Sequence, residues 1–180
     1  MITGGPGTGK TTVIKSLQKT FGYAIQMEAG RSIIQQQMLQ KGTLLPWLDP
    51  SGFADAMFRI SHQQYLENQL HSETVIFDRG IPDIIGFLHL YNLPVPKAYL
   101  DAATDLRYQS KVFIAPPWKE IYTKDAERQQ SWQEAKATYL VMLNVYTKLG
   151  YQLIHLPLDS PLNRTLFIHQ HIVANTAASF

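Results

Sequence analysis

Short apolar runs alternate along this chain with longer stretches in which apolar residues recur every three or four positions. Apolar runs bounded by turn residues predict buried strands, and the longer period predicts helices. Strands are expected at residues 1–3, 23–27, 74–77, 111–115 and 151–155. Because strands and helices alternate, the pattern predicts a three-layer α/β/α fold in which helices cover both faces of a mostly parallel, five-stranded sheet.

The helices are expected at about residues 10–20, 31–41, 51–71, 82–91, 97–107 and 129–149, with a last one from about residue 161. The first places Val13, Ile14 and Leu17 on one face. It should end near Gly22, because glycine readily adopts the left-handed conformation of a helix C-terminus. Ser51 follows a proline and is the expected N-cap of the helix at 51–71.

A glycine-rich motif lies between the first strand and the first helix. Gly4, Gly9, Lys10 and Thr11 match the phosphate-binding pattern G-x-x-x-x-G-K-[ST]. In this motif backbone N–H groups cradle phosphates, the lysine reaches the terminal phosphates, and the threonine hydroxyl binds Mg²⁺. The alternative is a turn that only caps the helix. We expect the residues that bind Mg-ATP to be Gly4, Gly5, Gly7, Thr8, Gly9, Lys10, Thr11 and Thr12.

The strand in front of this motif is unusually short. Only residues 1–3 precede Gly4, whereas a buried parallel strand normally has about five or six residues. Either the start of the chain was assigned or cut too late, or the sheet tolerates a short middle strand. We expect the first explanation. The missing strand residues would then affect the stability of the protein more than its chemistry.

Acidic and basic residues follow two of the predicted strands, where ligands of open α/β sheets bind. Asp78 ends "TVIFDRG" and is expected to hold Mg²⁺ together with Thr11, the alternative being a plain helix cap. Glu28 ends the second strand and could orient or deprotonate an acceptor hydroxyl, or simply favour a helix N-terminus. Arg31 or Arg79 would bind an anionic group of the acceptor.

Residues 116–130 follow the fourth strand, where phosphate-transferring folds often place a cover over the nucleotide. Lys119, Lys124 and Arg128 are basic residues that could approach the phosphates, and Arg128 is the expected catalytic one. The alternative is a solvated helix start with an ion pair between Asp125 and Arg128.

The composition fits one folded domain over residues 1–180, with 45% hydrophobic and 17% charged residues. The absence of cysteine excludes disulfides, thiolate zinc sites and cysteine nucleophiles. Net charge is only +2, yet residues 1–41 hold five basic residues against one acid, which favours a small anionic ligand over nucleic acid. No membrane span or leader is evident, so a cytoplasmic location is expected.

The histidines and tryptophans have structural interpretations. His169 and His171 point to different faces of the last helix, which argues against a shared metal. His169 shares a face with Leu162, Leu166 and Val173 and is expected in the core. Trp47 and Trp118 either stack on a base or, as we expect, pack within their loops.

The segments "TGGPGTGKTT", "EAGR", "LPWLDP", "FDRGIPD", "VFIAPPW", "IYTKDAERQ" and "LGYQLIHLP" resemble, in order and over nearly the whole chain, the predicted-ATPase AAA-domain family grouped with the kinase domain of the NadR regulator. The resemblance implies a fold like that of nucleoside and nucleotide kinases. It matches Lys10 and Thr11 to the phosphate and Mg²⁺ positions, Asp78 and Arg79 to the "DRG" acid and arginine, and Arg128 to the cover arginine. Gln129 stands where a second basic residue is expected.

These features predict a phosphotransferase that uses ATP and Mg²⁺ and a small-molecule acceptor, without nucleic acid or membrane as partners. A nucleotide-dependent regulator with slow hydrolysis is the alternative. A ring-forming ATPase motor is disfavoured, because Arg79 rather than a water-activating glutamate follows Asp78 and because the chain has no room for a further helical subdomain.

Overall fold

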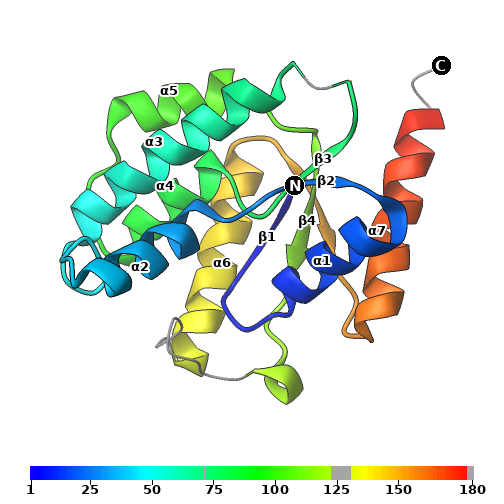
Figure 1. Cartoon of the computed structure of the whole chain (residues 1–180), viewed down its shortest axis with the longest axis horizontal. Coiled ribbons are helices and arrows are strands. Elements are labelled where there is room, and N and C mark those ends of the chain that lie inside the picture. Colours follow the sequence, from blue (N-terminus) through cyan, green and yellow to red (C-terminus); the bar gives the residue numbers. More distant parts are fainter. Residues whose placement is uncertain (71, 123–130, 178–180) are drawn as a thin grey trace.

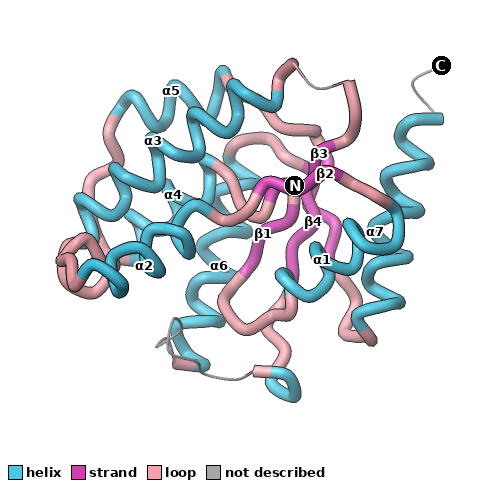
Figure 2. The backbone as a smooth tube through the Cα atoms, in the orientation of Figure 1, coloured by secondary structure: helices cyan, strands magenta, loops and turns pink. Residues whose placement is uncertain are grey.

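Five parallel strands form the centre of the molecule (Figures 1 and 2). The computed structural model describes residues 1–70, 72–122 and 131–177. Within them the strands are β1 Ile2–Gly4, β2 Ala24–Gln26, β3 Val75–Phe77, β4 Lys111–Ala115 and β5 Gln152–His155. Each lies within or next to a predicted strand, so the hydrophobic pattern identified all five.

The helices follow the predicted order. They are α1 Lys10–Phe21, α2 Ala29–Gln40, α3 Pro50–Asn68, α4 Ile81–Leu90, α5 Lys97–Asp105, the short 3-10 helix η1 Lys119–Ile121, α6 Trp132–Lys148 and α7 Pro161–Ala177. The prediction of Ser51 as the cap of α3 is wrong. Asp49 caps this helix by accepting a hydrogen bond from the Gly52 N–H at 2.9 Å, which leaves Pro50 at the first helical position, where its missing N–H costs nothing.

The sheet is assembled from a three-stranded part and a two-stranded part. One has the order β1-β4-β5 and the other pairs β2 with β3, all in parallel. A parallel bridge between Ile2 and Asp78 joins them, and the Arg79 N–H donates to the Ile2 carbonyl at 2.9 Å. The strand order is therefore β2-β3-β1-β4-β5, which places the carboxyl ends of β1, β2 and β3 next to one another.

Helices cover both faces of the sheet, as predicted. On one face α1 and α7 pack on Phe113 and Ala115 of β4. On the other face α6 packs on Val112 and Ile114 of the same strand, and α4 packs against α6. Helices α2, α3 and α5 extend this second layer to one side of the molecule (Figure 1). The alternation along β4 explains its continuous apolar sequence, because both faces are buried.

Helix α7 buries a different face from the one predicted. Leu162, Leu166 and Val173 are 57%, 39% and 50% exposed, whereas Arg164 and Ile168 are buried. The buried side begins with polar residues, so an apolar pattern could not reveal it. His169 lies at the edge of this interface, with its ring stacked on Phe21 at 3.6 Å and its Nδ1 atom 2.9 Å from the Tyr23 hydroxyl.

A second cavity, of about 610 Å³, lies in front of β1, at the amino-terminal ends of the strands. Met1, Ile2, Ile76, Phe77 and Phe113 are among its lining residues. The Met1 amine is buried, and burial lowers its pKa to about 6. Strand β4 begins at Lys111, two residues before Phe113, which is the first residue of β4 that pairs with β1. The edge of β4 therefore extends along this cavity.

We expect an apolar extension in front of Met1 to stabilise the protein. Val-Ile-Val would continue β1 into the cavity, and burying about two of these side chains contributes about 2–4 kcal/mol. A Ser-Gly-Ser extension of equal length is the matched control, because both replace the buried amine by an amide. Urea unfolding should give a higher free energy of unfolding for Val-Ile-Val, and equal values would contradict the prediction.

The same experiment has a pH signature. The folded amine has its pKa lowered to about 6, whereas the unfolded amine titrates near 8. Its contribution to stability is therefore present above pH 8 and is lost as the pH falls toward 6. Both extended chains should lack this loss, since their new amine lies outside the cavity.

Candidate active site

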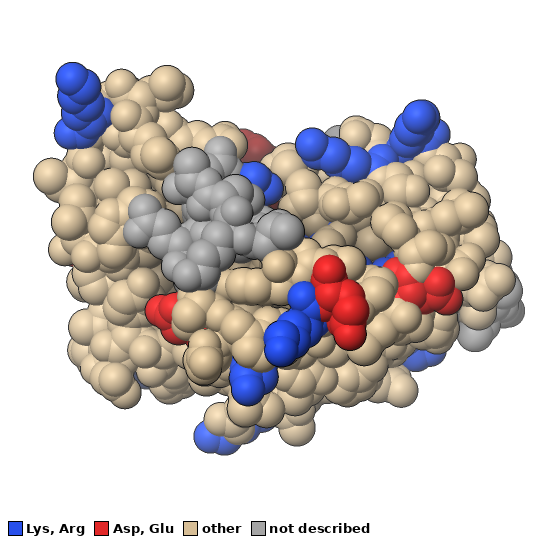
Figure 3. All heavy atoms as spheres, turned by 90° about the horizontal axis from the view of Figure 1, so that it is seen from below, with Lys and Arg blue, Asp and Glu red and all other residues tan. Residues whose placement is uncertain are grey.

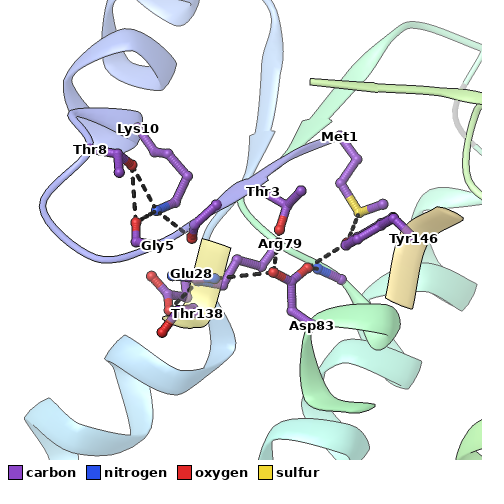
Figure 4. A network of polar contacts seen from close by, with 12 residues as sticks. Met1, Thr3, Gly5, Thr8, Lys10, Glu28, Arg79, Asp83, Thr138 and Tyr146 are labelled. Atoms are coloured by element: carbon purple, nitrogen blue, oxygen red, sulfur yellow. Dashed lines mark hydrogen bonds and ion pairs between the residues drawn. The ribbon is translucent and has the colours of Figure 1, made fainter. Parts of the chain in front are cut away.

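The glycine-rich segment forms a loop between β1 and α1 that folds around the lysine side chain (Figure 4). Lys10 Nζ donates to the carbonyl of Gly5 at 2.7 Å and to that of Gly4 at 3.2 Å. Thr8 Oγ1 donates to the Gly5 carbonyl at 3.0 Å, and Gly9 is the N-cap of α1 with a φ of 76°. The loop thus has a left-handed residue where its chain turns into the helix.

Two neighbouring segments pack tightly on this loop. A Cβ atom on Gly5 would lie 2.5 Å from the Ala135 carbonyl of α6, so the loop backbone rests directly on that helix. A Cβ atom on Gly7, whose φ is 70°, would lie 2.5 Å from the ring of Tyr122. The described part of the 116–130 segment therefore lies against the loop. Lys124 and Arg128 lie outside the described residues, and Lys119 is exposed.

One cavity of about 680 Å³ connects the loop with the ends of β2 and β3. This volume is in the usual range for ligand sites. The predicted site residues that line it are Gly7, Thr8, Gly9, Lys10, Thr11, Thr12, Glu28, Arg31, Asp78 and Arg79. Gly4, at the end of β1, and Gly5, in the loop, are not among the lining residues, and their carbonyls accept hydrogen bonds from Lys10. Trp118 also lines the cavity, whereas Trp47 is 40% exposed and lies outside it.

Burial changes the electrostatics of the two groups nearest the loop. Burial lowers the pKa of the Lys10 ammonium to about 7, and Arg79 acts in the same direction. Burial and the charge of Glu28 raise the pKa of the Asp78 carboxyl to about 6. Asp78 Oδ1 is buried and has no hydrogen-bond partner among the described residues. A lone carboxylate oxygen beside a threonine-bearing phosphate loop fits a divalent cation.

Glu28 and Arg79 form an ion pair at the mouth of the cavity. Arg79 Nε lies 2.8 Å from Glu28 Oε1. Burial alone would raise the pKa of Glu28, but Arg79 and Lys10 outweigh it and lower the pKa below its usual range. Arg79 has a φ of 67°, which is unusual for a residue with a side chain. Its side chain reaches from the end of β3 to Glu28, the residue in front of α2. Glu28 is therefore ionised at neutral pH.

Asp83 is a site residue that the sequence analysis missed. It is buried in α4 and accepts hydrogen bonds from Thr3 Oγ1 at 2.5 Å, Tyr146 OH at 2.5 Å and Arg79 Nη1 at 3.1 Å (Figure 4). It also accepts one from the Gly80 N–H at 3.0 Å. The carboxylate thus fixes Arg79 from the side opposite to Glu28. Its position four residues after Arg79 at a helix start was the available signal.

Arg164 is a second residue that was missed. It is only 2% exposed, and its Nη1 donates to the Thr8 carbonyl at 2.8 Å. Its guanidinium lies 6.0 Å from the centre of the Trp118 ring, and its Nε has no partner among the described residues. Arg164 therefore connects the start of α7 to the phosphate loop. An arginine four residues before the buried Ile168 was the signal in the sequence.

Charged side chains are dispersed over the face of the molecule that Figure 3 shows. Figure 3 shows the molecule from below, the side toward which β1 runs, and basic and acidic side chains are interspersed on this face. Among the described residues no cluster of three or more histidine or acidic side chains has the geometry of a metal centre. Within the same part of the chain, no helix combines the length and apolarity that crossing a membrane requires.

Several solved structures with similar folds are small-molecule kinases. Deoxyadenosine kinase from M. mycoides with bound dATP has a TM-score of 0.68 and 16% identity, and the match covers 95% of this chain and 96% of that one. Shikimate kinase from Acinetobacter baumannii in complex with shikimate has a TM-score of 0.61 and 15% identity over 97% and 92%. At these identities the likeness shows the fold alone, which is an α/β P-loop kinase-like fold.

Comparison with curated proteins found no match. A family model described as an AAA domain matches residues 1–164, which includes the phosphate loop, both strand-end acids and the start of α7. This chain therefore belongs to that AAA-domain family, and its fold is that of P-loop kinases.

Proposed function

We propose that this protein is an ATP-dependent phosphotransferase that moves the γ-phosphoryl group of Mg-ATP to a hydroxyl group of a small molecule. The observation that carries the proposal is the single cavity that joins the phosphate loop to the Glu28–Arg79 pair. A nucleotide at the loop and an acceptor at the pair would meet inside it. The kinase folds of the similar structures support the same reading.

The donor half would use the loop and Lys10. The loop N–H groups and the Lys10 ammonium would bind the phosphates. Because burial lowers the pKa of Lys10, a bound phosphate would favour the protonated form of its amine. Thr11 and Asp78 would hold Mg²⁺, which neutralises phosphate charge when it is bound. Arg164 holds the loop in place through Thr8.

The acceptor half would use Glu28. Its ionised carboxylate would accept a hydrogen bond from the acceptor hydroxyl and take its proton as the new oxygen–phosphorus bond forms. The bond between the γ-phosphorus and the bridging oxygen breaks, and ADP leaves. Arg79, fixed by Glu28 and Asp83, and Arg31, which lines the same mouth, would position the acceptor. Arg128 is proposed to approach the phosphates from the 116–130 segment.

An ADP-release assay tests this function. The purified chain is incubated with Mg-ATP and a panel of nucleosides, nucleotides and vitamin-like alcohols, and at least one acceptor should raise ADP production above background. If ATP binds but no acceptor raises turnover, the kinase proposal fails and a nucleotide-dependent regulator is favoured.

Replacing Asp78 by asparagine tests the Mg²⁺ position. Burial of the ionised carboxyl costs free energy, so Asp78→Asn should leave the melting temperature unchanged or higher. The Mg²⁺-dependent gain in ATP-analogue affinity should fall about tenfold or more, because a charged ligand is lost. Asp101→Asn, on the exposed side of α5, is the matched control in calorimetry. An undiminished Mg²⁺ effect in Asp78→Asn would contradict the assignment.

A further inference from the structure

The part of the cavity beyond the Glu28–Arg79 pair, here called the acceptor chamber, has an apolar wall. Helices α2, α3 and α4 supply it through Ile34, Phe53, Met57, Ile84, Phe87 and Tyr91. The helices approach closely here, since a Cβ atom on Gly30 would lie 3.0 Å from Met57 Sδ and 3.4 Å from Phe53. A side chain at residue 30 would therefore require Met57 to shift by a few tenths of an ångström.

Three aromatic rings form a row in this wall. The ring centres of Phe53 and Phe87 are 5.5 Å apart and those of Phe87 and Tyr91 are 4.6 Å apart, with tilted planes. Phe87 is partly buried and Tyr91 is 41% exposed, so ring surface remains accessible from the cavity. Such surfaces favour a planar ring, because contacts between aromatic rings are more favourable than the burial of the same apolar area alone.

The charges at the chamber are balanced. Around the Glu28–Arg79 pair the cavity is lined by the acids Glu28 and Asp83 and by the cations Arg31 and Arg79, while Lys10 and Arg164 contact the phosphate loop. Arg79 already contacts both acids, and Arg31 acts on the charge of Glu28. The exposed Glu134 carboxylate, which also lines the cavity, acts on Tyr91, whose pKa burial and this charge both raise. An anionic acceptor would therefore meet a carboxylate in the chamber.

We infer that the acceptor is a neutral alcohol that carries a planar aromatic ring, with the ring against Phe87 and Tyr91 and the hydroxyl at Glu28. This inference rests on the proposed function and selects one acceptor class for it. Small hydroxy acids and phosphorylated alcohols are disfavoured, because the two arginines that line the chamber among the described residues already act on its carboxylates. The ring would bury apolar area while the polar end faces the ion pair.

Binding and turnover with matched probes test the inference. The probes are deoxyadenosine as a neutral ring alcohol, deoxyadenosine 5′-monophosphate as the same ring with charge, and shikimate as an anionic alcohol without an aromatic ring. Pyrimidine and pyridine alcohols extend the neutral set. Calorimetry is done with a non-hydrolysable ATP analogue present, and ADP release is measured in parallel. A neutral ring alcohol should bind at least about tenfold more tightly than either anionic probe.

Phe87→Ala should weaken binding of the preferred neutral probe about tenfold or more and leave the affinity for the ATP analogue unchanged. Phe58→Ala is the matched control, because Phe58 is also partly buried but stacks on Tyr99 outside the cavity. If Phe87→Ala does not fold, Phe87→Leu keeps the apolar bulk without the ring and should show a smaller loss of the same sign.

Each outcome decides one proposal. If the ATP analogue does not bind, the proposed function fails. If it binds and shikimate or the monophosphate is the better acceptor, the kinase stands and the neutral-ring inference is overturned. Equal effects of Phe87→Ala and Phe58→Ala on acceptor affinity would also overturn it.

Discussion

Lys10→Met is expected to reduce phosphoryl transfer by about 100- to 1,000-fold or more, because it removes a cation at the position where the transferred phosphate would be bound. The effect on stability should differ from that of a typical substitution of a buried residue, which lowers the melting temperature. Burial lowers the pKa of Lys10 to about 7, so the charged side chain is held at a cost in the folded chain. The melting temperature of Lys10→Met should therefore equal or exceed that of the unchanged protein.

A loss of activity without a loss of stability would show that Lys10 has a binding role and not a structural one. Lys15→Met is the control, because Lys15 is exposed on the next turn of the same helix and lies outside the cavity. It should keep both activity and stability. Initial rates of ADP release and thermal unfolding measured on both variants check the prediction. An active Lys10→Met protein would show that the loop does not bind the reacting phosphate.

Asp83→Ala is expected to destabilise the protein by about 3–5 kcal/mol, since it removes the partner of a largely buried guanidinium and of buried hydroxyls. Tyr146 is fully buried, and burial and Asp83 raise the pKa of its hydroxyl well above the usual range. Without Asp83, the Tyr146 and Thr3 hydroxyls lose their acceptor, and Arg79 keeps only Glu28.

Asp101→Ala is the matched control for this change. Its carboxylate also pairs with a cation four residues away, Lys97 at 2.7 Å, but both groups are solvent-exposed. Exposed pairs contribute about 0–1 kcal/mol, so this variant should be nearly as stable as the unchanged chain. Urea unfolding of both proteins gives the comparison. A loss below about 1 kcal/mol in Asp83→Ala would mean that the network does not hold the sheet to α4 and α6.

The order of strands and helices could be predicted because each has a local signal. The continuous apolar sequence of β4 requires burial on both faces, and the glycines of the phosphate loop require left-handed backbone. The glycine-rich motif also indicated where Lys10 and Thr11 would lie. These features depend on neighbouring residues, so the sequence alone carries them.

The network around Asp83 could not be predicted in the same way. Its partners come from β1, the turn after β3 and helix α6, and they meet only when the sheet has formed. Arg164 similarly reaches a loop 156 residues earlier in the chain. The buried face of α7 was misjudged for a related reason, because a buried arginine reads as a solvent-exposed position in a pattern of apolar residues.

The contact between Gly5 and Ala135 gives α6 a place in both halves of the cavity. One turn of the helix supports the phosphate loop, while Thr138 and Met142, further along it, line the acceptor side about 4 to 10 Å away. Because α6 is a continuous helix, a tilt at the phosphate loop also moves its residues on the acceptor side. If both ligands bind as proposed, a tilt of α6 on occupation of one end would change the fit at the other, and linkage makes such cooperativity equal in both directions.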